Sequence, residues 1–268
     1  MNLTAALETG GTLSDFKITP DSKNLLFSRV DQSGSANLYK TSLSGATDPI
    51  LVTTRTIYDY DISADGSFVV FSSFPSYRFV PELYRVPFAT SAAGEIKLNH
   101  NMVEGGMVLQ FIITPDSRRV VYHASDTASQ TFGLFVASLD GLDPIVKLND
   151  FPIVSWGTYP YHISSNSQYV IYPNDDRSVF YSVPLMGPSD ATVRLTTELP
   201  AHGSIGPYSL TPDNRLFLYT ADIEVDGAYD LYQVPITGPA AVAVKINGPL
   251  AEGGLCVAFN MLALKAVM

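Results

Sequence analysis

Cysteine, tryptophan and clustered positive charge are all scarce in this sequence. Cys256 is the only cysteine, which excludes an internal disulfide. The 16 Lys and Arg residues are scattered along the 268 positions, and the formal net charge is −10. Because clustered Lys and Arg supply the affinity of a phosphate-binding surface, we expect no nucleic-acid partner.

Targeting and membrane-spanning signals are also missing. Residues 1–11 contain no basic stretch followed by an apolar run, so no signal peptide is visible. No apolar run approaches the roughly 20 residues that a helix needs to cross a bilayer. We therefore expect no membrane insertion, and the single cysteine leaves the compartment open.

What the sequence does contain is one phrase repeated five times. Each copy has an aromatic residue, an apolar residue, Ser or Thr, a small residue or Pro, and then Asp or Asn, in that order. Each anchor Asp or Asn is followed by one more small or polar residue, and the anchors of the five copies are spaced 44, 51, 50 and 47 positions apart: Asp21, Asp65, Asp116, Asn166 and Asp213. Such a period indicates a repeat architecture.

The third copy shows what one repeat contains. Residues 107–114 are mostly apolar and predict a buried strand, and Pro115 and Asp116 are typical of a tight turn. Further β-branched and aromatic runs predict strands at 119–123, 133–139 and 145–148. The same four runs recur in the other copies, so each repeat predicts four short antiparallel strands.

Four strands per repeat of this length predict an all-β fold, a β-propeller of four-stranded antiparallel blades. The repeats span about 10–53, 57–99, 105–149, 155–196 and 203–247, with a partial sixth at 253–268 completed by 1–5. We therefore expect residues 1–268 to form one domain, a six-bladed propeller with an incomplete last blade. A five-bladed ring and a fragment of a longer array are the alternatives.

The repeat resembles a known family. Three of its parts resemble the WD40-like repeats of TolB-type propellers. They are the turn and second strand, as in Thr114-Pro115-Asp116-Ser117 with Val120-Val121-Tyr122, the third strand, as in Leu83-Tyr84-Arg85-Val86-Pro87, and the fourth, as in Lys147-Leu148-Asn149. The resemblance implies a bacterial protein, periplasmic or extracellular, of a kind that includes binding scaffolds and the gating domains of prolyl oligopeptidases. It covers nearly the whole chain and is poor evidence for a specific function.

The five anchor residues are the first candidates for a site. Asp21, Asp65, Asp116, Asn166 and Asp213 could suggest a shared function around a ring, but each occupies the same turn. Because Asp and Asn side chains accept hydrogen bonds from nearby backbone N–H groups, we interpret all five as structural.

A second candidate is the acidic segment at 222–227. Asp222, Glu224 and Asp226 alternate before Gly227, as in the first half of a calcium-binding loop. Glu224 departs from the usual pattern and no downstream Glu completes the loop. The alternative is a solvated hairpin tip, so calcium is the only cofactor for which the sequence offers a hypothesis.

A third candidate is the mouth of the central channel, where residues preceding each inner strand would converge. Trp156 and His202 occupy neighbouring register positions, and Glu104 and Glu252 fall near the same rim. Aromatic-lined concave surfaces with few polar groups are typical of ligand sites. These four residues are the predicted ligand-binding set, with ordinary loop residues as the alternative.

No catalytic set emerges from the sequence. There is no Gly-x-Ser-x-Gly elbow and no clustered Cys and His. We therefore predict a non-catalytic scaffold that binds a protein or other ligand through its loops or channel, in an unknown oligomeric state. The alternative is a propeller lyase or hydrolase, which needs His162 or His202 beside a carboxylate, or the gating domain of a prolyl-oligopeptidase-like protein.

Overall fold

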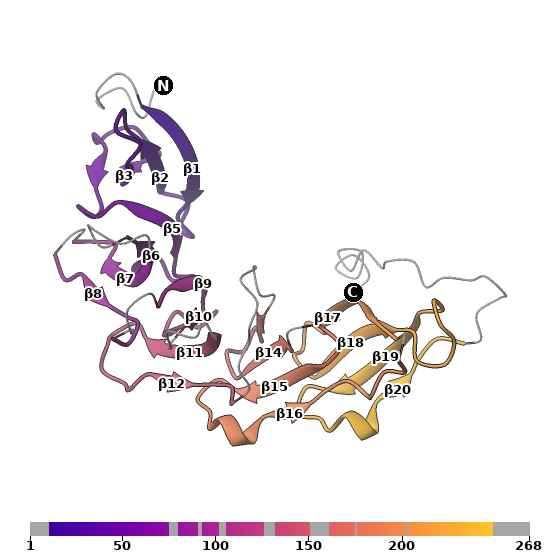
Figure 1. Ribbon diagram of the computed structural model, residues 1–268. Coiled ribbons are helices and arrows are strands. Elements are labelled where there is room, and N and C mark those ends of the chain that lie inside the picture. The colour runs from indigo at the N-terminus through magenta and orange to yellow at the C-terminus, as the bar shows by residue number, and fades with distance from the viewer. Residues whose placement is uncertain are drawn as a thin grey trace. The chain divides into compact units, whose positions relative to one another are not determined.

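The computed structural model describes residues 11–74, 80–90, 93–101, 106–125, 132–150, 161–174, 176–201 and 203–248 (Figure 1). The chain divides into two compact units, Met1–Val146 and Lys147–Met268, which are treated separately below. Two short 3-10 helices, Ser189–Ala191 and Ala240–Val242, interrupt the described strands of the second unit. Within these ranges no helix has the length and hydropathy needed to cross a membrane.

Twelve strands of the first unit form three four-stranded sheets in which neighbours along the chain pair in order. The first sheet contains β1 (Thr12–Ile18), β2 (Asn24–Val30), β3 (Ala36–Ser42) and β4 (Ile50–Leu51). The second contains β5 (Ile57–Ile62), β6 (Phe68–Ser73), β7 (Glu82–Pro87) and β8 (Ile96–Lys97). The third contains β9 (Val108–Ile113), β10 (Arg119–Ser125), β11 (Phe132–Ser138) and β12 (Val146–Lys147).

The second unit repeats the same order in two sheets. The fourth sheet contains β13 (His162–Ile163), β14 (Tyr169–Pro173), β15 (Phe180–Pro184) and β16 (Val193–Arg194). The fifth contains β17 (Ile205–Leu210), β18 (Leu216–Ala221), β19 (Asp230–Pro235) and β20 (Val244–Lys245). The all-β class and the four-stranded antiparallel repeat expected from the sequence are confirmed, while the number of blades and a single closed domain stay predictions.

Strand alternation gives every sheet two different faces. One face, here called the aromatic face, has an aromatic row across paired strands, as in Tyr60, Phe71 and Tyr84 of the second sheet. The opposite, aliphatic face is represented by Leu26, Leu38 and Val52 in the first sheet, and all three are buried. Successive side chains of a strand point to opposite faces, so the two sets cannot mix.

Sheets pack by placing the aliphatic face of one against the aromatic face of the next. Leu26, Leu38 and Val52 form one cluster with Tyr60 and the rest of the aromatic face of the second sheet. Equivalent clusters join the second sheet to the third and the fourth to the fifth. Burial of these side chains is the main stabilising term of each junction, at about 1.5–3 kcal/mol for each fully buried large apolar side chain.

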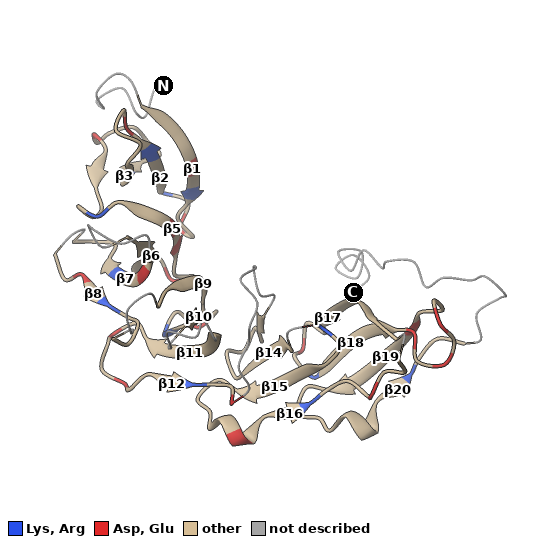
Figure 2. Cartoon of the chain, viewed as in Figure 1, with Lys and Arg blue, Asp and Glu red and all other residues tan. Residues whose placement is uncertain are grey.

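Charged residues are distributed over many strands rather than gathered. In Figure 2 the Lys and Arg positions fall on separate strands of both units. Lys97 pairs with Glu82 at 2.5 Å, and Lys245 pairs with Asp230 at 2.8 Å. These two pairs occupy the same register in the second and fifth sheets, which identifies them as repeated cross-strand contacts.

Candidate functional site

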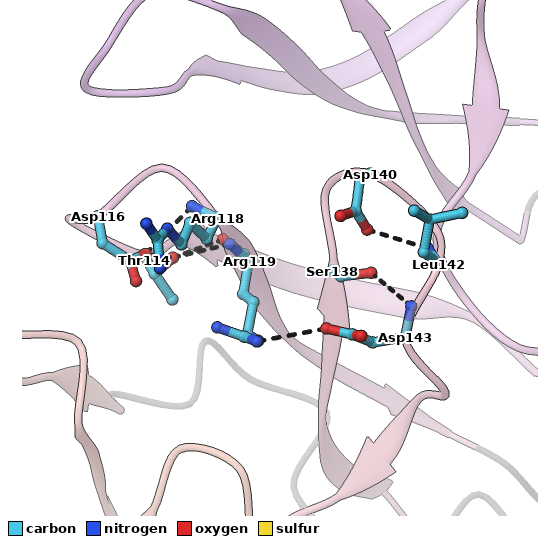
Figure 3. Close-up of polar contacts among 8 residues, drawn as sticks. All are labelled: Thr114, Asp116, Arg118, Arg119, Ser138, Asp140, Leu142 and Asp143. Carbon is cyan, nitrogen blue, oxygen red and sulfur yellow. Dashed lines mark hydrogen bonds and ion pairs between the residues drawn. The ribbon is translucent and has the colours of Figure 1, made fainter.

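The five anchor residues lie in identical turns between the first and second strands of each sheet. In every turn the hydroxyl group two residues earlier donates to the anchor side chain, at 2.5–2.7 Å. The anchor side chain also accepts the backbone N–H two residues later, at 2.9–3.2 Å. Figure 3 shows this arrangement around Thr114, Asp116 and Arg118.

The residue that follows each anchor has a left-handed backbone conformation. Its φ angle is between 56° and 73° in all five turns: Ser22, Gly66, Ser117, Ser167 and Asn214. The hydrogen bond from Thr19 holds the pKa of the Asp21 carboxyl below its ordinary value, and Thr211 does the same for Asp213. The anchor carboxylates are therefore occupied by their own turns.

Two of these turns also contact the turn of the preceding sheet. The backbone N–H of Asp65 donates to the hydroxyl of Ser117 at 3.0 Å. In the second unit, the Asn214 side chain accepts the Ser165 backbone N–H and donates to the Ser165 hydroxyl, both at 2.7 Å. The left-handed residue of these two turns thus links neighbouring sheets through its small polar side chain. The sequence pattern did not predict this contact.

The acidic segment predicted as half of a calcium loop has divided roles. Asp222 is only 2% exposed and accepts backbone N–H groups from Ser204 and, at 3.2 Å, from Gly227. These hydrogen bonds hold the pKa of Asp222 below its ordinary value even though burial acts to raise it. Glu224 is exposed and pairs with Lys245 at 2.9 Å.

Asp226 is exposed at the tip of the same loop. Among the residues that the structure describes, no three His, Cys, Asp or Glu side chains are grouped so that they could hold a metal ion. The calcium hypothesis stays a prediction, and the geometry adds a structural role for Asp222. Ser204, which sequence reasoning missed, contacts both Asp222 and the Tyr229 hydroxyl and so ties β17 to the loop after β18.

The predicted channel-mouth set lies outside the described residues. The structure does not describe Trp156, His202, Glu104 or Glu252, so their grouping stays a prediction. His162, which entered the sequence analysis only through the enzyme alternative, does lie in a described concave surface.

That concave surface is a cleft of about 280 Å³ between β13 and β17, the first strands of two successive sheets. Its lining includes His162 and Tyr208, whose rings are in edge-to-face contact with centroids 5.4 Å apart. The rest of the lining combines polar groups with Leu210 and Pro212. We call this surface the β13–β17 cleft.

The two rings of the β13–β17 cleft differ in exposure. His162 is exposed to solvent on one side, yet the surrounding protein lowers the pKa of its imidazole below 6.5. Partial burial raises the pKa of Tyr208 above 10.0. Both groups are therefore neutral near pH 7, and each can exchange hydrogen bonds with a ligand.

A second, more polar cleft of about 390 Å³ lies beside β16 and includes Asp176, Arg194 and Glu198. Its guanidinium group is already engaged, because Arg194 donates to the backbone oxygens of Thr196 at 2.7 Å and Thr197 at 3.1 Å. The β13–β17 cleft is the better candidate, since the imidazole of His162 and the hydroxyl of Tyr208 retain hydrogen-bonding capacity, although Asn214 and Ser165 in the same lining bond to each other.

Comparison with known proteins supplies the fold. No known family model and no curated protein match the chain. Solved structures do match it. One of them, from a structural and mechanistic analysis of two prolyl endopeptidases, has 12% identity and a TM-score of 0.57, and the match covers 89% of this chain and 36% of that one. Prolyl oligopeptidase B from Galerina marginata has 13% identity and a TM-score of 0.56, with coverages of 92% and 37%.

A putative TolB from Agrobacterium tumefaciens has 15% identity and a TM-score of 0.46, and the match covers 88% of this chain and 80% of that one. This chain spans little more than a third of either prolyl peptidase. At such identities the likeness concerns the fold alone. The chain has a β-propeller fold built from repeated four-stranded antiparallel sheets, the repeat that its turn phrase predicted.

Proposed function

We propose that this chain is a non-catalytic propeller scaffold that binds a short peptide segment or a similar polar ligand in the β13–β17 cleft. The observation that carries the proposal is the cleft itself, where an imidazole and a phenol in edge-to-face contact, with centroids 5.4 Å apart, line a concave surface together with polar and apolar groups. Aromatic walls with a few convergent polar groups are typical of small-ligand sites.

The surroundings of His162 favour binding over catalysis. A general base needs a hydrogen-bonded nucleophile and a group that orients its imidazole. Within the described residues the ring of His162 contacts the Tyr208 ring, and no hydrogen bond joins it to a carboxylate or hydroxyl group. The cleft can therefore hold a ligand without the partners that proton transfer requires.

The position of the cleft also supports the proposal. β13 and β17 are the first strands of their sheets, and the Ser165–Asn214 contact fixes their turns against each other at one end of the cleft. A rigid wall reduces the ordering cost of binding. The strands therefore provide the scaffold, and the exposed ring edges provide the contacts.

The experiment is a binding screen with defined probes. A library of short peptides is titrated into ¹⁵N-labelled protein, and amide shifts are followed by NMR. We expect shifts confined to cleft residues, and an approximately tenfold loss of affinity in His162→Ala and in Tyr208→Ala, equivalent to about 1.4 kcal/mol for each.

Leu142→Ala serves as the matched control, because Leu142 is 84% exposed in a turn of the first unit. Binding that maps elsewhere, or that both cleft variants leave unchanged, would overturn the proposal. Peptide cleavage that disappears in His162→Ala would favour the enzyme alternative instead.

A further inference from the structure

The contact between His162 and Tyr208 has a counterpart between β1 and β5, inside the first unit. Lys17 and His162 each lie four residues before the anchor of their own turn, and Tyr60 and Tyr208 each lie five residues before theirs. Nζ of Lys17 is 5.5 Å from the centroid of the Tyr60 ring. The centroids of His162 and Tyr208 are 5.4 Å apart. In both units a nitrogen-bearing side chain of one sheet thus contacts the tyrosine ring of the next.

The two junctions differ at the residue that follows this tyrosine. In the first unit it is Asp61, whose carboxylate pairs with Lys17 at 2.9 Å. In the second unit the same position holds Ser209, which belongs to the lining of the β13–β17 cleft. Its hydroxyl donates to the backbone oxygen of Leu210 at 3.3 Å. The second unit therefore has the imidazole in place of the ammonium group but lacks the carboxylate that accompanies it in the first unit.

The charges around the β13–β17 cleft favour a negative group at this place. Among the described residues that line the cleft there is no Asp or Glu. Burial raises the pKa of the Tyr208 hydroxyl, and the positive charge of Arg177, in the loop between β14 and β15, acts in the opposite direction. An anion beside the imidazole of His162 would favour its protonated form, because opposite charges at short distance stabilise each other.

From this difference between the two junctions we infer that the ligand of the β13–β17 cleft carries a carboxylate, which takes beside His162 the place that Asp61 holds beside Lys17. The inference rests on the proposed function, because it names the chemical class of the ligand for the same cleft. A carboxylate that accepts a hydrogen bond from an imidazolium forms a charge-assisted bond, which is stronger than a neutral one. The C-terminus of a peptide and an acidic side chain both supply this group.

Four acetylated five-residue peptides of alternating Ala and Leu separate the charge from its source. One has a free C-terminal carboxylate and one is its C-terminal amide, and the other two are amides with Glu or Gln as the central residue. Each is titrated into ¹⁵N-labelled protein, and amide shifts are followed by NMR. We expect the free acid or the Glu amide to bind about tenfold more tightly than its uncharged counterpart, the difference between a hydrogen bond to a charged and to a neutral group. The tighter of the two acidic peptides identifies the source of the carboxylate.

The repeat itself supplies the variants. Ser209→Asp introduces the carboxylate that the first unit has at this position, so we expect it to pair with His162 and to abolish the preference for acidic peptides. Ser209→Asn is the matched control, because Asn has the size of Asp without its charge, and it should keep the preference. His162→Lys introduces the residue of the first unit and should also keep it. Circular dichroism verifies the fold of each variant.

The outcomes distinguish this inference from the proposed function. If charged and uncharged peptides shift the cleft residues with equal affinity, the inference is overturned and the proposed function stands. Equal effects of Ser209→Asp and Ser209→Asn overturn it as well, since size rather than charge would then be the cause. If neither these four peptides nor the peptide library shifts the cleft residues, both are overturned.

Discussion

The repeated turn makes a quantitative prediction for Thr114, whose side chain is 1% exposed. Its hydroxyl donates to Asp116 at 2.6 Å and accepts the backbone N–H of Arg119 at 2.9 Å. Thr114→Val keeps the size and the β-branch and removes both contacts. A hydrogen bond to a charged group contributes about 1.5–3 kcal/mol and a neutral one about 0.5–1.5 kcal/mol.

Part of this loss is offset, because Asp116 is exposed and still accepts the backbone N–H of Arg118 at 3.1 Å. We therefore expect Thr114→Val to lower the free energy of unfolding by about 2–3 kcal/mol, near the lower end of the summed contributions. Urea denaturation followed by circular dichroism measures the change.

The repeat supplies its own control. Serine stands at the equivalent position in the second and fourth turns, as Ser63 and Ser164, and makes the same contacts. Thr114→Ser keeps the hydroxyl and loses one methyl group, at a cost of about 1 kcal/mol. If the valine variant is no less stable than the serine variant, the hydroxyl is not the stabilising group and the reasoning is refuted.

Three further predictions concern groups away from that turn. Asn214→Ala should lower the stability of the second unit by about 1–2 kcal/mol, because it removes both contacts with Ser165, whereas Asn214→Asp should retain the one that Oδ1 accepts; urea denaturation of the two variants compares them. Burial lowers the pKa of His123 to about 4. Between pH 6.5 and about 4 the unfolded chain therefore binds more protons than the folded chain, and the free energy of unfolding decreases by about 3 kcal/mol as the pH is lowered through this range. His123→Phe should flatten this part of the stability profile, and an unchanged slope would contradict the assignment. Asp222→Ala should cost about 1–3 kcal/mol by leaving the Ser204 and Gly227 N–H groups without their acceptor, which thermal melting of the variant can check.

The turns and strands could be predicted because their causes are local. The hydroxyl and the anchor side chain of each turn are two residues apart, and the N–H groups they bind lie within five residues of the hydroxyl. The predicted strands at 119–123 and 133–139 correspond to β10 and β11, with bounds that differ by one or two residues. Period-two patterning and turn chemistry are both readable within one repeat.

The β13–β17 cleft could not be predicted in the same way. His162 and Tyr208 are 46 positions apart in the sequence, and their rings meet only because two sheets pack side by side. Asp222 shows the same limit, since its partner Ser204 lies 18 residues away and nothing in the acidic segment indicated that contact. A side chain with several possible partners is assigned by the fold rather than by its neighbours in sequence.

The sequence by itself determined the repeat, its four strands and the turn that joins the first two, because those features depend on contacts within a few residues. Only the tertiary structure decided in which copies of the repeat the aromatic side chain of the phrase is buried. Phe16 and Phe111 occupy the same position of the same phrase, yet 57% of one and 8% of the other is exposed. The difference arises because burial depends on whether another sheet covers the face, and no residue within the repeat determines that.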